Sequence, residues 1–233
     1  MDTPLSGRTI DLNADLGEEV TDDEALLAVV TSANVACGYH AGGPAIMRAV
    51  CAEAARRDVA VGAQVSYDDR ENFGRVAHDV AYEVLREQVA DQVGTLAAVA
   101  AEEGTSVRYL KPHGALYHRV IDDEEQAAAV LEGSAHLPVL GMTGAFLTLA
   151  AAAGRPIFHE GFPDRGYTPD GRLVPRSEPG ALIEDEDDIV AQALTLAGTV
   201  DSVCLHGDSP GAVAHAVAVR RALEAAGYVL HTF

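Results

Sequence analysis

In two stretches a short apolar segment ends in a cluster of ionisable residues and is followed by a helical pattern. They are Val107-Arg-Tyr-Leu-Lys-Pro-His113-Gly and Ser202-Val-Cys-Leu-His206-Gly-Asp208. The same shape recurs, more weakly, at residues 9–15, 33–40, 61–64 and 156–160. Chemistry gathered at the carboxyl ends of successive parallel strands is how α/β barrels build their active sites. The pattern therefore indicates an enzyme of α/β architecture.

The apolar runs and the helical patterns alternate along the whole chain. Strands are expected at 8–15, 33–38, 59–66, 107–112, 137–142, 156–161 and 202–206. Helices are expected at 22–30, 44–57, 79–103, 123–133, 145–153, 184–198 and 211–226. Such alternation predicts a parallel sheet with right-handed crossovers. Because the first strand is followed by Asp-Leu-Gly-Glu-Glu rather than a glycine-rich nucleotide turn, a closed ring is favoured over an open sheet. We expect a distorted seven-stranded (β/α) barrel.

The length of 233 residues suits a single domain spanning 1–233. Residues 162–180 interrupt the alternation, and the Asp170-Gly171 pair at their centre is a hairpin-turn signal. We expect this excursion to cover the mouth of the barrel.

Charge and composition narrow the classes of partner. The formal net charge is −20, which argues against nucleic acid, because a phosphate backbone needs a basic surface. An anionic substrate would need a local pocket of Lys and Arg. No apolar run approaches the length of a membrane span, and the N-terminal residues 1–7 lack the order of a signal peptide, so a cytoplasmic protein is expected. The three widely spaced cysteines indicate reduced thiols, and Cys37 and Cys204 lie in strand-like runs, where a free cysteine is usually a small buried residue.

The first strand carries Asp11, Asn13 and Asp15 on one face. Buried polar groups are costly unless they are satisfied by partners or by a ligand. For Asp11 we expect a structural hydrogen-bond network beneath the site. For Asp15, at the end of the strand, we expect a functional role.

The sharpest cluster is Lys111-Pro-His113-Gly. Lys111 is suited to binding a carboxylate or phosphate as a point charge, and His113 to acid–base work near neutral pH. His40 also ends a strand, where a functional and a structural role are both open.

The remaining candidates lie at the last two strand ends. His206 precedes a helix start, where Asp208 is either a metal ligand or a helix cap. Glu160 is a candidate base at the end of the sixth strand. The arginines of the excursion (Arg165, Arg172 and Arg176) either hold a substrate carboxylate or form salt bridges within the hairpin.

Five segments taken together resemble the LamB/YcsF family. They are Asp11-Leu-Asn-Ala-Asp-Leu-Gly-Glu18, Ser32-Ala-Asn-Val-Ala-Cys-Gly-Tyr-His-Ala-Gly, Lys111-Pro-His-Gly-Ala-Leu-Tyr117, residues 160–176 and His206-Gly-Asp-Ser-Pro-Gly-Ala212. The resemblance implies a seven-stranded α/β barrel of the glycoside hydrolase/deacetylase type. It also implies ATP-dependent opening of the 5-oxo-L-proline lactam to L-glutamate, together with two partner subunits, B and C.

One departure from the family pattern bears on metal binding. Family members commonly carry Gly-Ala-His-Pro-Ser-Tyr where this chain has Gly62-Ala-Gln64-Val-Ser66-Tyr67. If the family histidine is a metal ligand, Gln64 is a poor replacement, because an amide oxygen suits hard cations rather than zinc. We therefore expect Mg²⁺ accompanying ATP as co-substrate, and no tightly bound cofactor.

The expected mechanism begins with phosphorylation of the lactam oxygen by ATP, after which water attacks the activated carbon. Lys111 and His113 would stabilise the developing charge, Asp15 or Glu160 would act as the base, and Asp208 would hold Mg²⁺. The substrate would be bound by His40, Gln64, Arg165, Arg176 and His206.

Two alternatives remain open. The first is an ATP-independent, metal-dependent amidohydrolase or deacetylase with Asp15 and His40 as ligands. The second is a non-catalytic subunit that binds a lactam and delivers it to partner proteins.

Overall fold

Every strand is parallel to its neighbours in the sheet of the computed structural model, which describes residues 8–209 and 211–233. The N-terminal residues 1–7, compared above with a signal peptide, lie outside the described part. The strands are β1 (Arg8–Leu16), β2 (Ser32–Ala36), β3 (Ala60–Val65), β4 (Val107–Pro112), β5 (Val139–Gly141), β6 (Ile157–Gly161), β7 (Ser202–Leu205) and β8 (Tyr228–Leu230). Because β1 pairs with both β2 and β7, strands β1 to β7 close into a ring in chain order. The prediction of a seven-stranded (β/α) barrel is confirmed.

The eighth strand was not predicted. It pairs with the start of β1, from Arg8 to Ile10, before β1 enters its pairings with β7 and β2. Its three residues follow directly after helix α8, and a strand of that length has no periodicity that a sequence pattern can reveal.

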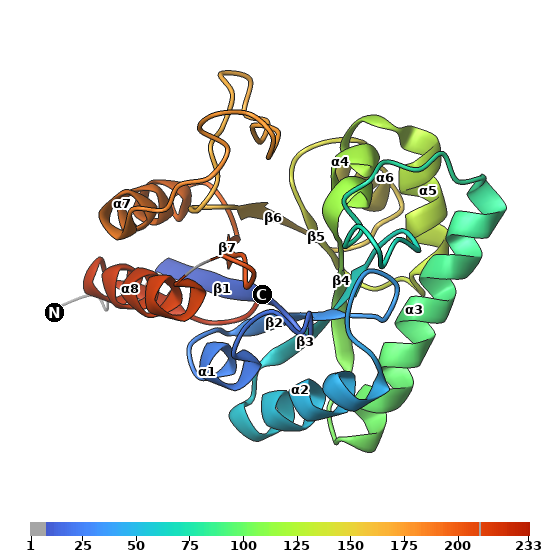
Figure 1. Ribbon diagram of the computed structural model, residues 1–233, viewed down its shortest axis with the longest axis horizontal. Coiled ribbons are helices and arrows are strands. Elements are labelled where there is room, and N and C mark those ends of the chain that lie inside the picture. The colour runs from blue at the N-terminus through green and yellow to red at the C-terminus, as the bar shows by residue number, and fades with distance from the viewer. Residues whose placement is uncertain (1–7, 210) are drawn as a thin grey trace, which may run out of the picture.

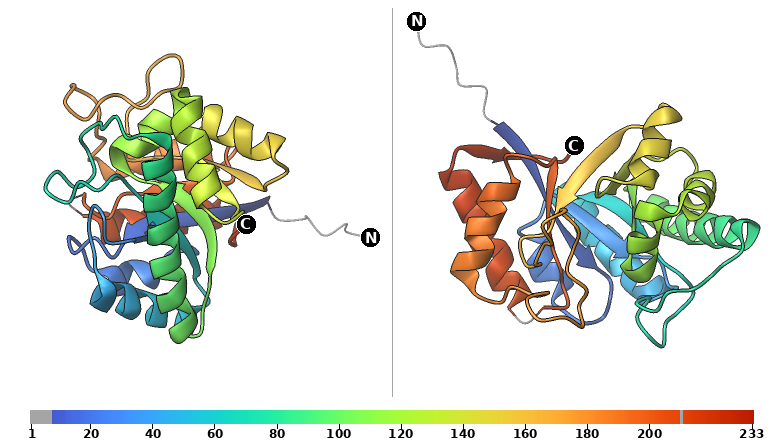
Figure 2. Two further views of the ribbon diagram at one scale, coloured as in Figure 1. Left: turned by 90° about the vertical axis from the view of Figure 1, so that its right-hand side faces the viewer. Right: turned by 90° about the horizontal axis from the view of Figure 1, so that it is seen from above.

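Helices follow all seven strands of the ring. They are α1 (Asp23–Leu27), α2 (Pro44–Arg57), α3 (Tyr82–Glu102), α4 (Gly114–Asp122), α5 (Glu124–Gly133), α6 (Ala145–Ala152), α7 (Glu186–Leu196) and α8 (Ala212–Ala225). Figure 1 and the turned views of Figure 2 show them around the outside of the strands, with α7 and α8 packed together on one side and α3, α5 and α6 on another.

Helix α4 was also not predicted. It begins directly after β4, with Gly114 at a positive φ of 58° and no side-chain cap at His113. A tertiary contact supports its first turn instead, because the Ala115 amide donates to the Gly74 carbonyl over 2.8 Å. The sequence therefore lacked the usual start signal of a helix.

The excursion leaves the barrel after β6 and projects from the ring of strands (Figure 1), and its Leu173 packs with Tyr117 and Ile121 of α4. Antiparallel bridges join Arg165 to Leu182 and Tyr167 to Leu173, with Gly171 at a positive φ of 81° in the turn. None of the helices in residues 8–209 and 211–233 combines the length and the apolar composition of a membrane span.

Candidate active site

A chain of buried polar side chains runs up the inside of the barrel along β1. Asp11 lies at its lower end. It accepts hydrogen bonds of 2.6 Å from both Thr31 and Ser32, and a third hydrogen bond from Ser202. Burial raises the pKa of Asp11, and these hydroxyl donors act in the opposite direction. All three donors are neutral hydroxyl groups. Asp11 therefore lies in a hydrogen-bond network of the structural kind that the sequence led us to expect.

Asn34 on β2 connects this network to the mouth of the barrel. Its amide group donates to Asn13 over 2.7 Å and to Asp15 over 2.9 Å. Its oxygen accepts a hydrogen bond of 2.7 Å from the Tyr109 hydroxyl. The Tyr109 ring has room in the barrel because its β3 neighbour is Gly62, where an added Cβ would lie 2.3 Å from the ring.

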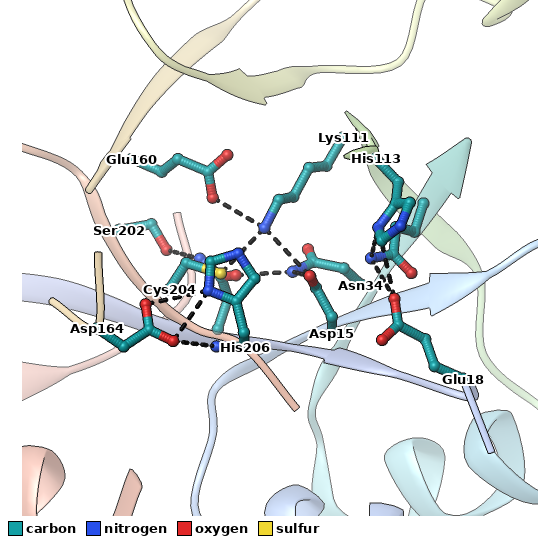
Figure 3. Close-up of polar contacts among 12 residues, drawn as sticks. Asp15, Glu18, Asn34, Lys111, His113, Glu160, Asp164, Ser202, Cys204 and His206 are labelled. Atoms are coloured by element: carbon teal, nitrogen blue, oxygen red, sulfur yellow. Dashed lines mark hydrogen bonds and ion pairs between the residues drawn. The ribbon is translucent and has the colours of Figure 1, made fainter. Parts of the chain in front are cut away.

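Lys111 lies at the end of β4 with its ammonium group among three side chains (Figure 3). Lys111 Nζ is 3.2 Å from Asp15 Oδ1, 3.0 Å from Glu160 Oε2 and 3.0 Å from Cys204 Sγ. Burial opposes the charge on Lys111, but Asp15, Cys204 and Glu160 outweigh it and raise its pKa above the usual value. For Asp15, burial is likewise outweighed by Lys111, and its pKa is lowered. The two residues therefore form a buried, charged pair.

Glu160 differs from Asp15 although both contact Lys111. It is buried at the end of β6, and this burial raises its pKa in spite of the nearby lysine.

Cys204 is a buried free thiol, as are Cys37 and Cys51, and burial raises the pKa of all three. The expectation that Cys37 and Cys204 are buried is confirmed.

A second cluster joins the ends of β1, β2, β3 and β4. Glu18 Oε1 lies 3.4 Å from His40 Nε2, 3.5 Å from His113 Nδ1 and 2.9 Å from Gln64 Nε2. The two imidazole rings are stacked with their centroids 3.9 Å apart. Burial lowers the pKa of His113 to about 4 and also lowers the pKa of His40, whereas burial raises the pKa of Glu18.

His206 follows β7 and forms a close pair with Asp164 from the excursion. The carboxylate of Asp164 lies 2.9 Å from His206 Nδ1 and accepts a hydrogen bond of 3.1 Å from the His206 amide. Burial would raise the pKa of Asp164, but His206 outweighs it and the pKa is lowered. The His206 ring also stacks on Phe162, with centroids 5.2 Å apart.

Asp208 lies at the rim between two arginines. Arg75 forms a hydrogen bond and ion pair with its carboxylate, and Arg176 Nη1 is 3.7 Å from the same oxygen. Burial would raise the pKa of Asp208, but Arg176 and Arg75 lower it. As a ligand of Mg²⁺, the role expected from the sequence, Asp208 would have to exchange its arginine partners.

Arg165 holds the excursion together. Its guanidinium donates to the carbonyl of Ala181 over 3.0 Å and to that of Val174 over 2.7 Å. Arg172 pairs with Asp122 of α4, so its salt bridge joins the excursion to the barrel rather than lying within the hairpin as the sequence suggested.

These groups surround a cavity of about 260 Å³ at the mouth of the barrel. Of the predicted residues, its wall contains Asp15, Lys111, His113, Arg165, Arg176, His206 and Asp208. Glu160 contacts Lys111 but is not part of that wall among the described residues, and His40 and Gln64 lie in the second cluster, next to His113.

Four residues near the site were not singled out from the sequence: Glu18, Asn34, Arg75 and His118. Asn34 lies in an otherwise apolar run, which is the signal that would have found it. Glu18, Arg75 and His118 line the cavity from loops and from α4, where the sequence carries no comparable signal.

The architecture and these contacts define a seven-stranded (β/α) barrel with a small, charged cavity at the carboxyl ends of its strands. The model of the LamB/YcsF family matches residues 10–233. The chain belongs to the LamB/YcsF family.

Several curated relatives cover almost the whole chain. The 5-oxoprolinase A subunit of Streptomyces avermitilis is 52% identical over 248 residues, covering 96% of this chain and 99% of that protein. The 5-oxoprolinase A subunit of Mycobacterium avium is 49% identical, covering 96% of this chain and 98% of that protein.

Solved structures share the fold. The lactam utilization protein from Thermus thermophilus superposes with a TM-score of 0.90 at 33% identity, covering 97% of this chain and all of that one. A family 4 carbohydrate esterase from Streptomyces lividans superposes with a TM-score of 0.58 at 12% identity, covering 97% and 92% of the two chains. The second likeness is one of fold alone, and it agrees with the expected deacetylase type of barrel.

Proposed function

We propose that this protein opens the lactam ring of 5-oxo-L-proline to L-glutamate as the A subunit of an ATP-dependent 5-oxoprolinase. The observation that carries the proposal is its full-length similarity to proteins named as the A subunit of 5-oxoprolinase, at 52% identity for the Streptomyces avermitilis protein. The protein from Thermus thermophilus, named for lactam utilization, supports the same substrate class.

The charge distribution of the cavity is consistent with this substrate. The chain as a whole carries a net charge of −20, whereas the cavity wall combines four cations (Lys111, Arg75, Arg165 and Arg176) with three carboxylates (Asp15, Glu18 and Asp208). The cavity is therefore less acidic than the chain as a whole, and its arginines can bind a small carboxylate such as 5-oxoproline. In this proposal Arg176, which adjoins the rim carboxylate of Asp208, binds the substrate carboxylate.

ATP, with Mg²⁺, is the proposed co-substrate. In the proposed reaction the lactam oxygen takes the γ-phosphoryl group and ADP leaves. Water then adds to the ring carbon, and the C–N bond breaks with a proton going to nitrogen, which leaves an acyl phosphate. A second water hydrolyses this acyl phosphate and releases phosphate and glutamate. The cavity of about 260 Å³ lies at the small end of ligand sites, so it suits a lactam better than a lactam and a nucleotide together. We therefore assign part of the nucleotide site to partner subunits B and C.

Lys111 is the proposed electrostatic catalyst. Its ammonium group remains charged because its pKa is raised, and it is fixed by Asp15 and Glu160 beside the cavity. A fixed charge in a site shielded from water stabilises charge that develops on an oxygen in the transition state. His113 is less suited to the charged role expected from the sequence, since a pKa of about 4 leaves it neutral near pH 7.

His206 is the proposed general base. Asp164 binds Nδ1 of its ring, which leaves Nε2 for the proton of the attacking water. Asp15 and Glu160, the bases expected from the sequence, are less suitable. The pKa of Asp15 is lowered, which makes it a weak base, and Glu160 is buried behind Lys111 and is not part of the cavity wall.

The test is release of glutamate and phosphate from 5-oxoproline, with the chain alone and with subunits B and C, in the presence and absence of ATP. Release that requires both ATP and the partners is the expected result. Glutamate formed without ATP would favour an ATP-independent, metal-dependent hydrolase. The observation in favour of that alternative is that Glu18, His40 and His113 lie close enough together to bind a metal ion. Partners that are fully active without this chain would refute a catalytic role for it.

A further inference from the structure

The second cluster has the composition and spacing of a metal site. One ligand atom each from Glu18, His40 and His113 lies within 4.8 Å of the other two, and all three residues are buried. Glu18 Oε1 is 3.4 Å from His40 Nε2 and 3.5 Å from His113 Nδ1. Ligands of a tetrahedral zinc ion, with bonds of about 2.0–2.1 Å, lie about 3.3 Å apart. Two of the three separations are therefore already close to that spacing.

The tautomer of His113 is set by the backbone. Its Nε2 lies 3.1 Å from the Phe73 carbonyl oxygen, which can only accept, so Nε2 carries the proton. The lone pair on Nδ1 consequently points into the cluster. A backbone carbonyl that holds the distal nitrogen is the outer contact that metal-binding histidines usually make.

The loop that carries Phe73 holds both imidazoles in place. The Phe73 ring meets the rings of His40 and His113 edge to face, with centroids 5.6 and 5.5 Å apart. The next residue is Gly74, at a positive φ of 67°, where an added Cβ would lie 2.9 Å from His40 Cβ and 3.2 Å from His113 Cδ2. The approach of this loop leaves both side chains little freedom to separate.

The amide of Gln64 lies at the spacing of a further ligand beside these groups. Its Nε2 is 2.9 Å from Glu18 Oε1 and 3.0 Å from His113 Nδ1, so one amide nitrogen donates to both. The other end of the amide, Oε1, is buried with no hydrogen-bond partner among the described residues. A half-turn of the terminal amide exchanges the two atoms and turns an acceptor towards the cluster.

We propose that Glu18, His40 and His113 bind one divalent transition-metal ion, with Gln64 Oε1 as a further ligand after this rotation. Two imidazoles and a carboxylate favour Zn²⁺, Co²⁺ or Mn²⁺ over Mg²⁺ or Ca²⁺, which prefer ligand sets made of oxygen. Glu18 and His113 belong to the cavity wall whereas His40 and Gln64 do not, so the open side of the site faces the cavity.

The experiment uses metal-depleted full-length protein titrated with Co²⁺, followed by visible absorption, and with Zn²⁺ by calorimetry. We expect one equivalent of Co²⁺ with the bands of a four- or five-coordinate ion, displaced by Zn²⁺. Glu18→Gln and His40→Ala should each weaken binding at least about tenfold, whereas Gln64→His should tighten it by at least about tenfold, since imidazole is the better ligand.

The matched control is His159→Ala. His159 forms an exposed pair with Asp201, 3.6 Å apart, and the change should leave the affinity for Co²⁺ unaltered. The proposal is overturned if the parent protein binds no stoichiometric Co²⁺, or if a folded Glu18→Gln variant binds it equally well. Should Glu18→Gln not fold, an unchanged affinity in Gln64→His overturns it instead. Binding is measured without lactam or ATP, so its failure is distinguishable from failure of the proposed oxoprolinase activity.

Discussion

Lys111 Nζ lies 3.2 Å from Asp15 Oδ1, and this contact joins the carboxyl ends of β4 and β1 inside the barrel. Lys111 is also the only lysine among the 16 Lys and Arg residues of the sequence. A chain that otherwise uses arginine for its cations has therefore buried its one ammonium group at the centre of the mouth. In the proposed function this ammonium group stabilises the charge that develops in the transition state. Lys111 is therefore the first residue to mutate.

Replacing Lys111 with methionine should lower kcat for ATP-dependent glutamate release by roughly 10²–10³, the scale of losing one fixed electrostatic contact to a transition state. It should also lower the free energy of unfolding by about 3–5 kcal/mol, because Asp15 would remain as a buried charge without its cation. Urea unfolding measures the second effect. Arg108→Met, which removes an exposed cation from the same strand, should change neither quantity by a comparable amount. Full turnover in Lys111→Met would refute the role.

Asn34→Ala should lower kcat with little change in KM. Asn34 donates to Asp15 over 2.9 Å and is held by the Tyr109 hydroxyl, so it fixes the carboxylate that in turn fixes Lys111. We expect a loss of about tenfold or more, since small displacements of catalytic groups are costly. Steady-state kinetics of the assembled enzyme separates the two constants. A rise in KM alone would show that Asn34 acts on substrate binding instead.

Arg176→Gln should raise KM for the lactam by about tenfold and change kcat less, as expected for loss of a contact made equally to substrate and transition state. The control is Arg172→Gln on the same excursion. Arg172 pairs with Asp122 rather than lining the cavity. The KM of the Arg172→Gln variant for the lactam should therefore equal that of the parent enzyme. Equal KM values in the two variants would remove Arg176 from the substrate site.

His206→Gln should reduce kcat by about 10²–10⁴, the usual contribution of a positioned general base. His118→Gln is the matched control, because His118 also lines the cavity but has no carboxylate partner among the described residues. If the two substitutions have the same effect, the Asp164–His206 pair is not the base.

The contribution of Asp164 to the free energy of unfolding should decrease at acid pH. Its pKa is lowered from the usual 3.8, so the folded state releases this proton more readily than the unfolded chain. Its contribution is therefore complete above the unfolded pKa and is lost as the pH falls through the lower, folded value. The difference in unfolding free energy between the parent and Asp164→Asn should be large at about pH 6 and shrink towards about pH 3.

Urea unfolding at the two pH values measures that difference for Asp164. Glu178→Gln, at an exposed position of the same excursion, should give a small difference at both. A difference for Asp164→Asn that grows towards acid pH would contradict the assignment.

The barrel and much of its mouth were predictable because they depend on local patterns. Alternating apolar runs and helical segments specified a parallel sheet, and polar residues at the strand ends pointed to Asp15, Lys111, His113 and His206, all of which line the cavity. Helix α4 and strand β8 were not predicted. The first turn of α4 is supported by a tertiary hydrogen bond, and β8 is too short to show a hydrophobic periodicity.

The sequence by itself determined which strand-end residues reach the mouth, since each strand fixes its last side chains at one edge of the ring. The tertiary structure alone decided how those residues divide. It placed Lys111 between Asp15 and Glu160, and it grouped His40 and Gln64 with Glu18 rather than in the cavity wall. Burial and neighbouring charges then set their protonation, holding Lys111 charged and His113 neutral. These are effects of distance in space, and they depend on contacts between residues far apart in the chain, such as Lys111 and Asp15, which are 96 positions apart.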